Sequence, residues 1–200
     1  MNSRGQTFST TALVISVVVI ITTLYLVSLI PRRLPLGGVD ELLVKGELYT
    51  LTVNALANAS KGGSFTSFLQ EQLQYVSQAY IPVLEASVED ATISEGLSRC
   101  TVSYRTPYGV VSFTVYLQLE LLSQSSSFDP ASGLYVVTLE VRVTCDQYYP
   151  RSVKFWTSYK TSWKRQGEVY VVEVSMETLA PFTLYCEDWR GVRTYINVSP

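Results

Sequence analysis

The chain has 200 residues, of which 47% are hydrophobic and 16% are charged, and its formal net charge is -2. Protein chains carry about 25% charged residues on average, so this chain has no basic surplus with which to bind nucleic acid. It contains no histidine, which excludes Ser-His-Asp and Cys-His catalysis and removes the most common metal ligand. We therefore expect no enzyme activity, no cofactor, no metal and no nucleic-acid partner.

A basic stub and a long uncharged stretch open the chain. No residue between Arg4 and Arg32 is charged, and Thr11–Ile30 is an apolar run, called the apolar segment below. About 20 apolar residues in a helix cross the hydrocarbon core of a bilayer, whereas a removable secretory signal has a core of about 7 to 15 residues. The pattern predicts a transmembrane or assembly helix within residues 1–30, followed by a Pro/Gly joint over residues 31–38.

The first residues carry a family resemblance. Arg4-Gly5-Gln6, a few hydroxyl residues and the apolar segment together resemble the class III (prepilin-type) signal of archaeal type IV pilin-like proteins. The resemblance implies that a prepilin-type peptidase cuts between Gly5 and Gln6, and that the hydrophobic helix survives and later packs in a filament core. Thr10 stands where many type IV pilins have Glu, which favours a minor or pilin-like protein over a major pilin. A plain N-terminal anchor and a removed signal are the alternatives.

Two helices are expected in residues 39–81. Leucines recur through Val39–Ser60 among good helix formers, and a break near Gly46 is left open. Ser64 then provides a cap for a second helix, in which aromatic and aliphatic residues recur every three or four positions up to Pro82. This apolar stripe predicts core packing rather than a ligand groove.

From residue 82 onward the hydrophobic period changes to two. Hairpin turns are indicated by Pro107-Tyr108-Gly109, by Asp129 to Gly133 and by Gln166-Gly167. About seven or eight strands result, with "SVKFWTSYKTSWKR" read as one strand. We therefore expect an α+β fold: the N-terminal helix, one or two further helices, and an antiparallel β-sandwich-like domain over residues 82–200.

Three cysteines lie far apart in the chain, at Cys100, Cys145 and Cys186. Cys100 and Cys145 both fall in strand-like segments, so a disulfide between them is predicted, which would imply an oxidising exterior. A pairing of Cys145 with Cys186, and three buried reduced thiols, remain open.

Two further patterns concern the exterior. Asn58 and Asn197 begin N-glycosylation sequons, which agree with export. An aromatic stretch holds Phe155 and Tyr159 on one face of a strand and Trp156 on the other, and cross-strand packing is the preferred reading over an adhesive or glycan-binding surface.

Together these patterns predict a structural subunit or minor component of a type IV pilus-like cell-surface filament or related secretion or adhesion machine. Residues 39–200 would form an extracellular domain, and the N-terminal helix would associate with the membrane and then with other pilin-like subunits. The alternative is a membrane-anchored extracellular binding or adhesion domain that does not polymerise. Charge barely decides the membrane orientation, because Arg4 and the amino terminus oppose Arg32 and Arg33.

Overall fold

The computed structural model describes residues 39–79, 83, 85–147 and 150–200. The chain divides into two compact units, Met1–Glu41 and Leu42–Pro200, and the second is called the main unit below. The described residues form two helices and nine strands. In chain order they are α2 (Val39–Ser60), α3 (Phe65–Ala79), β1 (Glu85–Ser94), β2 (Leu97–Thr106), β3 (Gly109–Asp129), β4 (Leu134–Cys145), β5 (Val153–Trp156), β6 (Lys160–Gln166), β7 (Val169–Met176), β8 (Phe182–Asp188) and β9 (Arg193–Val198).

Helix α2 runs without a break through Gly46. It ends in a glycine turn, in which the backbone N–H of Gly62 donates to the carbonyl of Ala59 and that of Gly63 donates to the carbonyl of Asn58. Gly62 has a φ of 95°, a left-handed conformation that glycine adopts without strain. Ser64 caps α3, since its hydroxyl accepts the backbone N–H of Ser67 at 3.3 Å.

The strands form a six-stranded sheet in the order β1-β2-β3-β4-β7-β6 and a three-stranded sheet in the order β5-β8-β9, and all their pairings are antiparallel. Strand β3 connects the two halves of the larger sheet. Its first residues pair with β2, its later residues pair with β4, and a bulge lies between Leu121 and Ser123. Because β2 and β4 pair with different parts of β3, the large sheet has two halves, and each half can pack against a different part of the protein.

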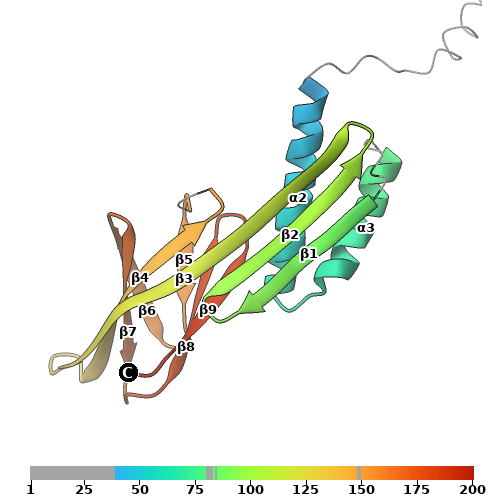
Figure 1. Ribbon diagram of the computed structural model, residues 1–200. Helices are drawn as coiled ribbons and strands as arrows, with labels where there is room; N and C mark the ends of the chain where they lie inside the picture. Colours follow the sequence, from blue (N-terminus) through green and yellow to red (C-terminus); the bar gives the residue numbers. More distant parts are fainter. Residues whose placement is uncertain (1–38, 80–82, 84, 148–149) are drawn as a thin grey trace, which may run out of the picture. The chain divides into compact units, whose positions relative to one another are not determined.

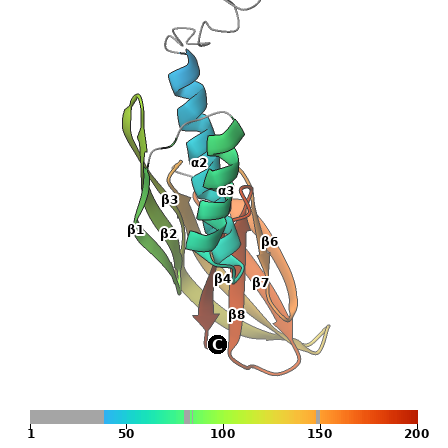
Figure 2. The same ribbon diagram turned by 90° about the vertical axis from the view of Figure 1, so that its right-hand side faces the viewer.

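Both helices cover one face of the β1-β2-β3 half of the large sheet (Figure 1, Figure 2). Leu48, Leu51 and Leu56 of α2 are buried in the same core as Val102 of β2. A buried hydrogen bond fixes the helix further. The hydroxyl of Thr52 donates to the Leu48 carbonyl at 2.8 Å, so it accepts the hydroxyl of Tyr104 at 2.7 Å.

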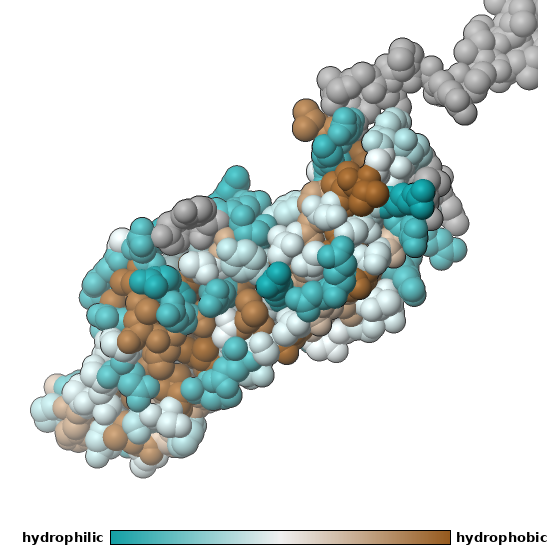
Figure 3. Space-filling view, in the orientation of Figure 1, coloured by the Kyte–Doolittle hydropathy of each residue, from teal (hydrophilic) through white to brown (hydrophobic). Residues whose placement is uncertain are grey.

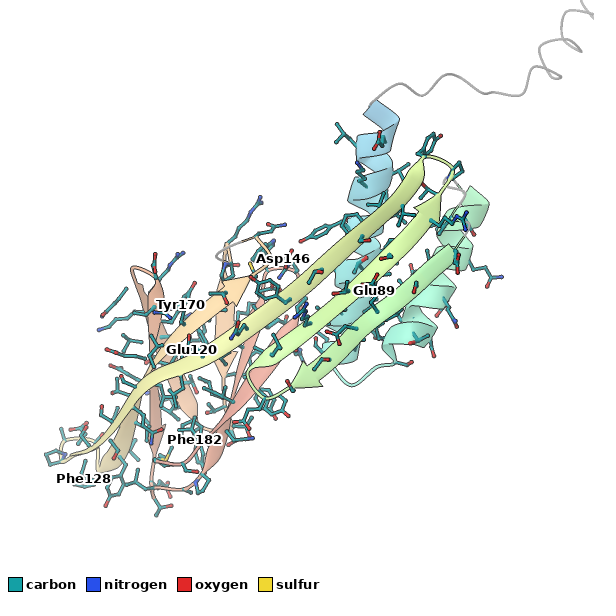
Figure 4. All side chains as sticks on the ribbon, viewed as in Figure 1. Glu89, Glu120, Phe128, Asp146, Tyr170 and Phe182 are labelled. Carbon is teal, nitrogen blue, oxygen red and sulfur yellow. The ribbon has the colours of Figure 1, made fainter. Side chains whose placement is uncertain are left out.

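The three-stranded sheet packs against the other half of the large sheet through aromatic rings. Phe155 of β5 lies 5.3 Å from Tyr170 of β7 and 6.0 Å from Trp163 of β6, measured between ring centroids. Tyr159 meets Phe182 of β8 edge to face at 6.1 Å. Figure 4 labels Tyr170 and Phe182, which come from the two different sheets.

The predicted fold class is wrong in two respects. None of the helices in the described part of the chain is long and apolar enough to cross a membrane, and the apolar segment lies outside the described residues. The described strands number nine, in sheets of six and three, rather than seven or eight in one sandwich-like domain.

The miscounted strand is the stretch from Ser152 to Arg165, which the period-two pattern presents as continuous. The structure divides it into β5 and β6, which belong to different sheets. The hydroxyl of Thr157 makes the break, since it accepts the backbone N–H of Tyr159 at 2.9 Å and lies 3.0 Å from the hydroxyl of Thr161. A threonine that bonds the backbone two residues on forms a turn in place of strand pairing.

Candidate binding site

The outer face of the three-stranded sheet carries one aromatic side chain on each strand. Trp156 of β5 is opposite Tyr185 of β8, and Tyr185 is opposite Tyr195 of β9. These three residues are called the aromatic row below. The ring centroids of Trp156 and Tyr185 lie 5.5 Å apart at an interplanar angle of 12°, and those of Tyr185 and Tyr195 lie 6.2 Å apart. Cross-strand alternation explains the row, because Phe155, Cys186 and Thr194 occupy the opposite, buried face.

A pocket of about 450 Å³ lies against the aromatic row. Its other walls come from Ser60 and Lys61 at the end of α2 and from Ile93 of β1. Ser60 is held in place, because its hydroxyl donates to the Ala57 carbonyl and accepts the backbone N–H of Arg193. Elements far apart in the sequence therefore build this pocket.

Two cations, Arg193 and Lys61, line the pocket and share one carboxylate partner outside it. Arg193 lies over the ring of Trp156 at 5.2 Å and pairs with the carboxylate of Glu187. The ammonium of Lys61 lies 3.9 Å from the same carboxylate. The site thus offers aromatic rings and hydrogen-bond donors side by side.

A second cluster, around Arg190, is buried and ties several elements together. Its guanidinium bonds the carboxylates of Asp146, which follows β4, and of Asp188 at the end of β8. It also donates to the hydroxyl of Tyr49 in α2 and to the carbonyl of Tyr116 in β3. Asp146, labelled in Figure 4, accepts the Tyr49 hydroxyl as well, at 2.7 Å.

Electrostatics indicate a structural role for this cluster. Burial alone would lower the pKa of Arg190, but the hydrogen bonds and charges of Asp146 and Asp188 outweigh it and raise that pKa. Burial raises the pKa of Tyr49, and its hydrogen bond to Asp146 raises it further. Both groups therefore stay protonated at neutral pH, and the ion pairs of Arg190 with Asp146 and Asp188 make the cluster a fixed joint between helix and sheets.

The predicted bridge between Cys100 and Cys145 is not present, and the three cysteines are free and buried. Cys100 is opposite Val115 and Cys145 is opposite Leu117, so β3 lies between the two cysteines. Two strand spacings are about 10 Å, whereas the Cα atoms of a disulfide lie within about 7 Å of each other. Cys186 is in the other sheet, on its core-facing side.

The remaining predicted sites are not brought together. Asn58 lies near the end of α2, and its side-chain amide donates to the Ser64 carbonyl at 3.5 Å. Asn197 is exposed on β9, where its amide accepts the hydroxyl of Thr183 and donates to Glu95. Gly5 and Gln6 lie outside the described residues.

Among the residues that line the pocket, sequence reasoning considered only Trp156 for ligand binding. Tyr185 and Tyr195 follow the period-two pattern of their strands, but nothing in that pattern says that the three strands are neighbours. The "EDWRG" stretch that holds Asp188 and Arg190 carries opposite charges two residues apart, and this was the available signal for the buried cluster.

Among the described residues no three His, Cys, Asp or Glu side chains gather as a metal site would require. The pocket beside the aromatic row, called the binding pocket below, is taken as the candidate site because it combines exposed aromatic rings with hydrogen-bond donors. Comparison with family models, with curated proteins and with solved structures found no match.

Proposed function

We propose that this chain is a structural subunit or minor component of a type IV pilus-like cell-surface filament, or of a related secretion or adhesion machine. In this proposal the apolar segment holds the chain at the cell membrane, with residues 39–200 outside the cell. A prepilin-type peptidase cuts between Gly5 and Gln6, and the subunit then joins other pilin-like subunits through the apolar segment. The N-terminal sequence carries the resemblance on which this rests.

The observation that supports the proposal best is the way in which α2 is held. The helix follows the apolar segment in the chain, and its Leu48 and Leu56 are fully buried in the main unit. Polar contacts reinforce it, because Thr52 bonds Tyr104 and Tyr49 bonds the Arg190 cluster. A helix fixed by both packing and buried hydrogen bonds can carry load into a sheet, as a subunit pulled from its N-terminal side requires.

A further support is an exposed apolar end of the main unit, defined by residues from three elements. Leu42 and Leu43 near the start of α2 are 71% and 62% exposed, and Val110 beside the β2–β3 turn is 69% exposed. Tyr108 in that turn and Tyr75 of α3 are exposed as well. Figure 3 shows hydrophobic residues at this end, where α2 begins. Exposed apolar groups that gather at one place mark interaction sites, and in a filament neighbouring subunits would cover them.

N-terminal sequencing of the native protein tests the processing step. A terminus at Gln6 supports the proposal, a terminus at Met1 favours a plain anchor, and a terminus beyond Ile30 contradicts both. Replacing Gly5 by leucine should block maturation while the chain stays in the membrane fraction.

Assembly is tested separately by shearing filaments from cells and measuring how much of the chain they contain. Leu42→Ser with Leu43→Ser should lower that amount without changing the processed N-terminus. Leu121→Ser is the matched control, since Leu121 is also exposed but lies on β3 beside its bulge. A processed chain that is never found in the sheared fraction would contradict the filament role.

That last outcome would favour the alternative, a membrane-anchored extracellular binding or adhesion domain that does not polymerise. The binding pocket on the three-stranded sheet is the specific observation behind it, because an assembly subunit has no need of an aromatic pocket.

A further inference from the structure

The aromatic row has features that cross-strand packing does not require. Packing between neighbouring strands would leave a flat face, but here Lys61 and Ile93 form walls beside the row and create a pocket. Tyr185 remains 39% exposed within it. An aromatic pocket with a few converging polar groups is the usual form of a small-molecule site.

The two cations beside the row already have a partner. Arg193 and Lys61 both pair with Glu187, and Glu95 lies beside Tyr195, where it accepts the backbone N–H and the amide of Asn197. The two cations that line the pocket, Arg193 and Lys61, are thus both paired with a carboxylate that lies outside its lining. A strongly anionic ligand such as a polyphosphate would have to compete with Glu187 for both cations, which reduces its advantage over a neutral ligand.

We propose that the aromatic row and its pocket bind a neutral oligosaccharide. A pyranose ring has an apolar C–H face that packs on an aromatic ring, and a rim of hydroxyl groups that both donate and accept hydrogen bonds. Trp156 and its two tyrosine neighbours supply the aromatic contacts. Arg193 and Lys61, which line the pocket, donate to sugar oxygens. Three rings in line, one per strand, favour a chain of sugars over a single one.

The site is already arranged for binding. Arg193 is held by its ion pair with Glu187 and by the ring of Trp156, and Trp156 is held by its stack with Tyr185. Side chains that are ordered before binding lose little conformational entropy when a ligand arrives. This inference goes beyond the proposed function, since filament assembly needs no saccharide.

The test uses the full chain, purified in a detergent without a sugar head group and applied to an array of neutral and acidic oligosaccharides. We expect binding to neutral oligosaccharides, with a saturable change in tryptophan fluorescence. Trp156→Ala and Tyr185→Ala should each weaken the affinity roughly tenfold, as the loss of one aromatic contact implies. Trp163→Ala is the matched control, because Trp163 is exposed on β6 and is not among the residues that line the pocket.

Melting curves of each variant report folding, and if an alanine variant does not fold, Trp156→Phe and Arg193→Gln replace it. Absence of binding to every neutral oligosaccharide overturns the inference. So does binding to acidic glycans alone, or binding that Trp156 and Arg193 substitutions leave unchanged. None of these outcomes bears on cleavage at Gly5, so the filament proposal stands or falls on its own experiments.

Discussion

At the scale of single residues, ion pairs differ in how much they contribute to the stability of the fold. The side chains of Arg190 and Asp188 are 5% and 0% exposed, and their ion pair lies where the helix and both sheets meet. Arg142 and Glu120 form a pair of the same type on neighbouring strands, but about half of each side chain is exposed. Water screens the second pair and not the first, so the two pairs make unequal contributions to stability.

Arg190→Met is expected to lower the free energy of unfolding by about 3 to 5 kcal/mol, because it leaves Asp188 buried without a partner charge. Arg142→Met, the control, should change that energy by less than about 1 kcal/mol. Denaturant unfolding followed by circular dichroism measures both. Equal effects of the two substitutions would show that the buried cluster has no special role.

Alkaline pH should destabilise the main unit through two buried residues. Burial raises the pKa of Cys100 from 9.0 to about 12 and that of Tyr104 from 10.0 to about 12. A pKa raised by folding gives stability that is present below the unfolded pKa and lost as pH rises toward the folded value. The free energy of unfolding should therefore fall between about pH 9 and pH 12, by about 3 kcal/mol from Tyr104 alone at 1.36 kcal/mol per pKa unit.

Tyr104→Phe and Cys100→Val should each remove part of this pH dependence while the folded spectrum at pH 7 is kept. Unfolding titrations at pH 7, 9 and 11 provide the measurement. A wild-type stability that stays constant up to pH 11 would mean that these groups are more hydrated than the structure indicates.

At the scale of elements, sequence patterns predicted the features that depend on neighbouring residues in the chain, such as hairpin turns. Gly109, Gly133 and Gly167 mark hairpin turns in the sequence, and all three have positive φ: Gly133 and Gly167 lie in turns that join paired strands, and Gly109 directly follows such a turn as the first residue of β3. The break at Thr157 could not be read in advance, because threonine is also a good strand residue and its hydroxyl bonds the backbone only in this turn. The exposed polar residues from Ser123 to Ser127 continue β3 because β4 pairs with them.

Helix α2 continues through Gly46, and a substitution at this position tests that continuity. A Cβ added at Gly46 would have no atom within 4 Å, and glycine costs a helix interior up to about 1 kcal/mol relative to alanine. Gly46→Ala should therefore raise the free energy of unfolding by about 0.5 to 1 kcal/mol. Gly62→Ala is the contrasting variant, since its φ of 95° strains any side chain, and it should lower that energy. A loss of stability in Gly46→Ala would contradict the continuous helix.

At the scale of the molecule, the binding pocket depends on which strands are neighbours. Trp156, Tyr185 and Tyr195 are up to 39 residues apart in the chain, and only the order β5-β8-β9 places them in one row. The separation of Cys100 and Cys145 also depends on strand order. The sequence places each cysteine in a strand, but only the sheet shows that β3 lies between them. The order of strands in a sheet is set by how the elements pack together. The alternation of apolar and polar residues within one strand shows which face is buried but not which strand is its neighbour.

Because the buried core runs from Leu48 to Val198, the main unit should fold without the residues that precede α2. Residues 39–200 expressed alone are expected to be soluble and to unfold in one cooperative transition. Leu56→Ala in the truncated chain should then lower the free energy of unfolding by about 2 to 5 kcal/mol, since Leu56 is fully buried against the sheet. Thermal and denaturant unfolding by circular dichroism measure both chains. An insoluble product, or one that binds a hydrophobic dye and unfolds gradually, would mean that the first 38 residues contribute to the core.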